Sequence, residues 1–194
     1  MARYGKEHKQ ATRQRIIEAA GRRFKRDGIN GSGVAVLMSD AGLTNGAFYA
    51  HFASKDDLVV NAVAQQLRDL AESLDAMAGD GGVEQLVRAY LSVEHRDHPA
   101  EGCPSAALLD EIGRCGQATK RAYTDGVVAI ADDIAARLAP HDPASLRLAV
   151  LTAYAGMVGT LQLARALADE QLSQAVLEQG ISNALALLSV PKPS

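Results

Sequence analysis

The sequence lacks the features that mark secreted and β-rich proteins. It has only two cysteines, Cys103 and Cys115, which are too few for a disulfide framework. No run of alternating β-branched residues lies between turn markers, so no strand is predicted. The basic N-terminus is not followed by the apolar core of a signal peptide. These absences predict an all-α protein of the reducing cytoplasm.

The usual signatures of enzymes are also missing. No glycine-rich phosphate loop, nucleophile elbow or pair of carboxylates stands out, so we expect no catalysis and no cofactor. Cys103 with His95 or His98 is the alternative, because a thiol beside an imidazole can form a nucleophile and its base. The types of side chain in 95–103 also suit Zn²⁺, but their spacing matches no paired-ligand pattern, so no metal site is predicted.

One stretch, 148–164, is free of charged residues over seventeen positions. This length lies at the lower edge of what spans a bilayer core of about 30 Å. Arginines flank the stretch at Arg147 and Arg165, and the other expected helices are amphipathic. We therefore interpret it as a buried or interface helix and predict no membrane partner.

Positive charge is concentrated at the start of the chain. Residues 1–26 contain nine Lys or Arg and two Glu. Residues 1–57 contain ten basic and six acidic side chains, whereas 58–194 contain ten basic and seventeen acidic ones. Neutralising DNA phosphates needs such a local surplus. The asymmetry predicts a nucleic-acid-binding part followed by a part with another role.

Residues 34–58 have the pattern of a helix-turn-helix. Apolar residues three and four apart in 34–41 share one face of a short helix. Gly42 can adopt the left-handed conformation that ends this helix, and the side chain of Thr44 can cap the next one. Ser54 to Asp57 forms a capping box at the start of a further helix. A plain helical hairpin is the alternative, since the same shape also occurs without DNA binding.

The second helix of this motif has two distinct faces. Phe48 and Phe52 lie four apart and are predicted to turn inward with Leu43. The other face would then be free to enter a major groove. The residues expected to face outward are Thr44, Asn45, Ala47, Tyr49, Ala50 and His51.

These segments resemble a known family. Ile16 to Ala20, Phe24, Gly28 and Ala41 to Leu58 are similar to the TetR family of bacterial transcriptional regulators, over roughly residues 15–58. The resemblance implies phosphate contacts from Tyr49, His51 and Lys55. It implies base contacts from Thr44, Asn45, Gly46 and Ala47. Gly33, Val36 and Ala50 depart from the usual pattern of the family, which leaves the operator sequence open.

The resemblance also implies an architecture and a function. We expect about nine helices, with a helix-turn-helix DNA-binding domain at 1–54 and an effector-binding and dimerisation domain at 55–194. The protein would be a homodimeric repressor of a palindromic double-stranded DNA operator. A small molecule, or an oxidant or electrophile that modifies Cys103, would release it. A Cys-dependent small helical enzyme and a helical protein-binding adaptor are the alternatives.

Apolar periodicity and turn residues predict where the remaining helices lie. A mobile basic arm is expected before residue 10, and Gly79 to Gly82 is expected to break the chain. Helices at 144–168 and 170–189 are apolar on more than one face, which indicates a bundle between two chains. The other helices are expected at 12–27, 54–77, 83–94, 105–114 and 117–138.

The second part offers two possible routes for a signal. Its only aromatic residues are Tyr90, Tyr123 and Tyr154, whose hydroxyls need partners if they are buried. They line a ligand pocket in one interpretation and bond to each other or to backbone carbonyls in the other. Cys103 is expected at the start of a helix, where the dipole favours a reactive thiolate. A half-buried structural cysteine is the alternative.

Overall fold

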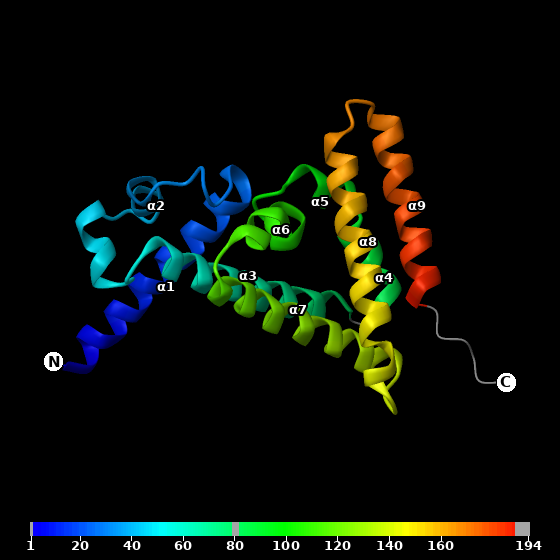
Figure 1. Cartoon of the computed structure of the whole chain (residues 1–194), viewed down its shortest axis with the longest axis horizontal. Coiled ribbons are helices and arrows are strands. Elements are labelled where there is room, and N and C mark those ends of the chain that lie inside the picture. The colour runs from blue at the N-terminus through cyan, green and yellow to red at the C-terminus, as the bar shows by residue number, and fades with distance from the viewer. Residues whose placement is uncertain (1, 79–81, 189–194) are drawn as a thin grey trace.

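The computed structural model describes residues 2–78 and 82–188, and within these ranges the chain is all-helical, with no strand. This confirms the fold class. Figure 1 shows the N-terminal helices at one side and α8 and α9 side by side at the other. The elements are α1 (Ala2–Asp27), α2 (Val34–Asp40), η1 (Asn45–Ala50), α3 (Lys55–Ala78), α4 (Gly82–Tyr90), α5 (Val93–Asp97), α6 (Pro104–Arg114), α7 (Gln117–Leu138), η2 (Pro143–Leu146), α8 (Arg147–Ala166) and α9 (Glu170–Leu188).

Several expected boundaries are correct. Gly28 and Gly42 have φ angles of 80° and 67° where the first two helices end, as the absence of a Cβ allows. The capping box is present, because the Asp57 amide donates to Ser54 Oγ over 3.1 Å and the Ala53 amide donates to the Asp57 carboxylate over 3.0 Å. The expected break at Gly79 to Gly81 lies outside the described residues.

Other expectations were wrong. The first helix begins at Ala2, so residues 2–10 continue α1 instead of forming an arm. The helix expected at 83–94 is two helices, because the Ser92 side chain accepts a hydrogen bond from the His95 amide over 3.1 Å and starts α5. Thr44 precedes η1 without capping it through its side chain. Its carbonyl instead closes the first turn with the Ala47 amide over 3.1 Å.

Two clusters of buried apolar residues hold the fold together. The first joins α1, α2, η1 and the first half of α3, and its largest buried side chains include Phe24, Leu37 and Phe48. Leu108 and Ile112 of α6 also belong to it. The second cluster joins α4, α6, α7, α8 and α9. Because α3 and α7 pack along each other, they connect the two ends of the molecule (Figure 1).

One face of α8 is apolar and exposed. Leu148 and Leu163 are 73% and 53% exposed, and Gly156 and Gly159 face open space. Of the described residues, Pro143–Ala166 form the single helix long and apolar enough to cross a membrane by length and composition, and 22% of its most apolar window is buried. This composition is equally that of a helix whose apolar face is covered by a protein partner.

Candidate functional site

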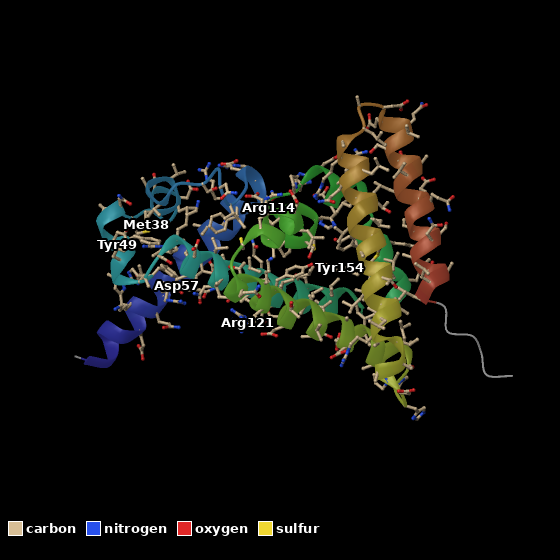
Figure 2. The ribbon with its side chains drawn as sticks, viewed as in Figure 1. Met38, Tyr49, Asp57, Arg114, Arg121 and Tyr154 are labelled. Atoms are coloured by element: carbon tan, nitrogen blue, oxygen red, sulfur yellow. The ribbon has the colours of Figure 1, made fainter. Side chains whose placement is uncertain are left out.

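The first candidate site is the exposed face of η1. Phe48 is completely buried and Phe52 is 2% exposed, whereas Tyr49 is 76% exposed. Phe48 stacks on Phe52, with ring centroids 5.7 Å apart, and this packing fixes the orientation of the segment. Figure 2 shows Tyr49 at the end of the molecule formed by α2 and η1. The other exposed residues of this face are Thr44, Asn45, Gly46 and Ala50.

Two residues expected to be exposed on this face are half-buried. Ala47 is half-buried and packs against the first cluster, because η1 is a six-residue 3₁₀ segment and turns its residues differently from an α-helix. His51 is also half-buried, and its Nδ1 has no hydrogen-bond partner among the described residues. Burial, with smaller contributions from Lys9 and Arg13, lowers the pKa of His51.

Part of the N-terminal positive charge is neutralised within the chain. Arg23 donates to the carboxylates of Asp27 and Asp40, each over 2.6 Å, and Arg26 pairs with Asp27 at 2.9 Å. Lys55 Nζ donates to the carbonyl of Ile29 over 2.6 Å. Lys55 therefore ties the start of α3 to the loop between α1 and α2.

The second candidate site is a cavity of about 590 Å³ between α1, α3, α4 and the loop that precedes α6. Ligand pockets of proteins typically have this size. Apolar residues, including Leu70 and Leu74, form part of its wall. Its polar lining residues include Lys25, Gln66, Tyr90, His95 and Cys103.

All four residues expected to form the effector site lie together. Cys103 is 1% exposed and immediately precedes α6, as predicted. Its Sγ is 2.9 Å from the hydroxyl of Tyr154, which donates to Ser105 Oγ over 2.8 Å, and Ser105 Oγ is 2.9 Å from the hydroxyl of Tyr123. Tyr154 extends from α8 toward α6 (Figure 2). The ring of Tyr90 packs edge-on against Tyr154, with centroids 5.8 Å apart.

His95 supports the loop that carries Cys103. Its Nε2 accepts a hydrogen bond from the Cys103 amide over 2.9 Å, so its Nδ1 carries the proton and donates to the Tyr90 carbonyl over 2.7 Å. Burial lowers the pKa of His95, which keeps the ring neutral. Because both ring nitrogens are engaged, His95 is placed to act neither as a base for Cys103 nor as a metal ligand. The described residues contain no group of three or more potential metal ligands.

The sequence did not single out Lys25 and Gln66, which form the polar floor of the cavity. Lys25 Nζ donates to the carbonyl of Gly102 over 2.8 Å and links α1 to the loop beside Cys103. Burial lowers the pKa of Lys25. Gln66 is 9% exposed, and neither Nε2 nor Oε1 has a partner among the described residues. Helical periodicity could have predicted that Gln66 is buried, because it lies three and four positions after the apolar residues Val63 and Ala62 on α3.

These features are an N-terminal helix-turn-helix segment with an exposed face, and a cavity lined by α1 and by later helices. Residues 16–62 match the family described as bacterial regulatory proteins, tetR family. The chain is 41% identical over 58 residues to the HTH-type transcriptional regulator AcrR of Shigella flexneri, which covers 30% of this chain and 27% of that protein. It is 30% identical over 104 residues to UidR of Escherichia coli K12, which covers 53% of this chain and 50% of that protein. The matched segments thus span between a quarter and a half of these relatives.

The fold as a whole agrees with this match. The structure of a TetR-family transcriptional regulator from Cytophaga hutchinsonii superposes with a TM-score of 0.76 at 19% identity, over 95% of this chain and 98% of that one. The resemblance found in the sequence is therefore confirmed for residues 16–62, which match the tetR family, and the chain as a whole shares the fold of this TetR-family structure.

Proposed function

We propose that the chain is a homodimeric repressor that reads a palindromic operator through η1 and leaves it when its second domain receives a chemical signal. The observation that carries this proposal is the exposed polar face of η1, held in place by buried Phe48 and lying within the segment that matches the family. In this proposal Thr44, Asn45 and Gly46 approach bases, and Tyr49, His51 and Lys55 approach phosphates. Ala47 supports this face from its half-buried position.

The proposed dimer forms through α8 and α9. These helices pack closely on each other, and their exposed surface includes Leu148, Leu163, Leu172 and Leu187, each at least 50% exposed. A second copy that presents the same surface would cover these leucines in a four-helix bundle. Gly156 and Gly159 leave room for a close approach of the partner helix. Two copies are needed to read the two halves of a palindrome.

Lys55 is expected to supply part of the electrostatic attraction to DNA. Lys55→Met keeps the length of the side chain but removes its charge. It should weaken binding to the DNA upstream of the gene and to unrelated DNA, and reduce the slope of log K against log salt by about 0.9, the value for one phosphate contact. Fluorescence anisotropy at several salt concentrations measures both quantities. Circular dichroism then tests whether losing the bond to Ile29 changes the fold.

Lys120→Met on α7 is the matched control, because it removes one positive charge outside the proposed DNA-binding residues. It should leave the salt slope unchanged. An equal slope for Lys55→Met and the unmodified protein would contradict the assignment of Lys55. Absence of tight, salt-sensitive binding to the upstream DNA by the unmodified protein would contradict the proposed function itself.

Cys103 is proposed as one route for the signal, since it is reachable through the cavity although it is only 1% exposed. With 1,4-benzoquinone, the thiol would add to a ring carbon. An S–C bond forms, the thiol proton and the displaced ring proton end on the two oxygens, and a hydroquinone thioether results. The bulky adduct cannot fit without breaking the 2.9 Å contact with Tyr154.

The expected result is that 1,4-benzoquinone releases the unmodified protein from DNA but does not release Cys103→Ser. Anisotropy with a labelled operator and mass spectrometry of the treated protein together measure release and adduct formation. Cys115→Ser is the control and should respond as the unmodified protein does. Release of Cys103→Ser to the same extent would remove Cys103 from the mechanism and leave reversible ligand binding as the signal.

A further inference from the structure

Among the described residues, the wall of the cavity contains buried polar groups that make no hydrogen bond. The Tyr90 hydroxyl is buried beside the side chains of Cys103 and Tyr154 but makes no hydrogen bond of standard geometry among the described residues, and both side-chain polar atoms of Gln66 also lack a partner there. Lys25 is half-buried and its one hydrogen bond is to the Gly102 carbonyl, with no carboxylate paired to it in the described part of the chain. Buried polar groups left unpaired are costly, so a ligand that pairs them is favoured.

Fewer acceptors than donors remain unpaired among the buried polar groups of the described cavity wall. Both nitrogens of His95 are hydrogen-bonded, and the Cys103 thiol lies 2.9 Å from the Tyr154 hydroxyl. The side-chain oxygen of Gln66 is the remaining unpaired acceptor in the described floor. A molecule that offers acceptors is therefore better matched to the cavity than one that offers donors. The lysine ammonium adds a preference for negative charge.

We propose that the cavity binds a small organic carboxylate with an apolar body, its carboxylate paired with Lys25 and its body against Leu70 and Leu74. This inference rests on the proposed function for its regulatory meaning but not for the binding itself. The carboxylate would accept hydrogen bonds from Lys25 and from Tyr90 or Gln66. A volume of about 590 Å³ accommodates such a molecule.

Acidic side chains at the rim do not outweigh this preference. Asp69, Glu94 and Glu101 line the opening but are exposed to solvent. Charges in water are screened within about 8 Å at physiological ionic strength. Lys25 is removed from most of that screening, so its attraction for a bound carboxylate is stronger at the same distance. The rim would slow the entry of an anion more than it would weaken its binding.

Binding would also change the connection between the two ends of the molecule. Lys25 belongs to α1, which packs against α2 and shares the first cluster with η1. Gly102 belongs to the loop before α6. A carboxylate competes with the Gly102 carbonyl for the ammonium and is the stronger acceptor because it is charged. A carboxylate that binds better when Lys25 is released from the Gly102 carbonyl shifts the population toward the released arrangement.

The test compares acids with their uncharged amides. Isothermal titration calorimetry of the full chain with 4-phenylbutyrate and octanoate, and with the corresponding primary amides, measures the contribution of the charge. We expect each acid to bind about tenfold more tightly than its amide, as a charge-assisted hydrogen bond implies. Lys25→Met should reduce this ratio to about one, and Lys120→Met should leave it unchanged. Tyr90→Phe, which removes an unpaired hydroxyl, should weaken binding of the acid without unfolding the chain.

The outcomes separate the inference from the proposed function. Three results would overturn the carboxylate site. They are equal affinities for acid and amide, no binding of either acid, and an unchanged ratio of acid affinity to amide affinity in folded Lys25→Met. Tight DNA binding that saturating acid does not change would overturn its regulatory role and leave the proposed function intact. Failure of the protein to bind DNA would contradict the proposed function. The ratio of acid affinity to amide affinity, measured by calorimetry, would still decide whether the cavity prefers carboxylates.

Discussion

Replacing Arg165 by methionine is expected to lower the free energy of unfolding by about 2–4 kcal/mol, because it leaves backbone carbonyls without partners. The guanidinium donates to the carbonyls of His95 over 2.6 Å, Arg96 over 3.0 Å and Ala106 over 3.2 Å. It thus joins α8 to α5 and α6. Methionine keeps most of the apolar stem but offers no donor. The side chain is only half-buried, so water would replace part of this loss.

Urea unfolding followed by circular dichroism measures this change. Arg147→Met is the matched control, because Arg147 lies on the same helix but pairs with Asp132 at the surface over 2.5 Å. Surface ion pairs contribute little to stability, so the control should unfold at nearly the midpoint of the unmodified protein. Equal midpoints for both variants would show that the three carbonyls find other partners.

Phe48→Ala should destabilise the chain by about 3–5 kcal/mol, the usual cost of removing a large aromatic side chain from a core. Phe48 is completely buried and contacts both Phe52 and the edge of Tyr49. Its loss would leave η1 without the packing that orients its exposed face. Sequence-specific DNA binding should disappear at temperatures where α7 and α8 remain helical. Thermal unfolding and anisotropy on the same samples measure both effects.

Tyr49→Ala tests whether stability and DNA binding can be separated at adjacent positions. The Tyr49 side chain is 76% exposed, so its removal should barely change the unfolding midpoint. It should still weaken DNA binding, since the hydroxyl is proposed to contact phosphate. A large loss of stability in Tyr49→Ala, or full DNA affinity in folded Phe48→Ala, would contradict this division of roles.

The features predicted best from the sequence are those set by local chemistry. Gly28 and Gly42 end helices because only glycine adopts positive φ without strain, and the box from Ser54 to Asp57 starts α3 because its side chains reach nearby amides. Phe48 and Phe52 were placed inward by their spacing alone. About nine helices are expected, and the described residues form nine α-helices. The numbers agree because two differences offset each other: the expected second motif helix is the 3₁₀ segment η1, and the expected helix 83–94 is two helices.

The polar floor of the cavity depends on contacts between distant segments. Lys25 is 77 positions from Gly102, and no periodic pattern links the two. Burial of Gln66 could have been inferred from the apolar stripe of α3, but not the absence of a partner for its amide. Cys103 was placed correctly at the start of a helix, whereas its contact with Tyr154 depends on how α8 packs against α6.

The first cluster also bears on how this protein can diverge from its relatives. Leu108 and Ile112 of α6 and Ile130 of α7 complete a core that otherwise lies within residues 16–67. An exchange of residues 1–54 alone would replace part of this core without the side chains that pack against it, and is therefore expected to lower stability. The exposed side chains of η1 carry no such constraint. Single substitutions on that face can therefore change its surface chemistry while the packing of the two clusters stays the same.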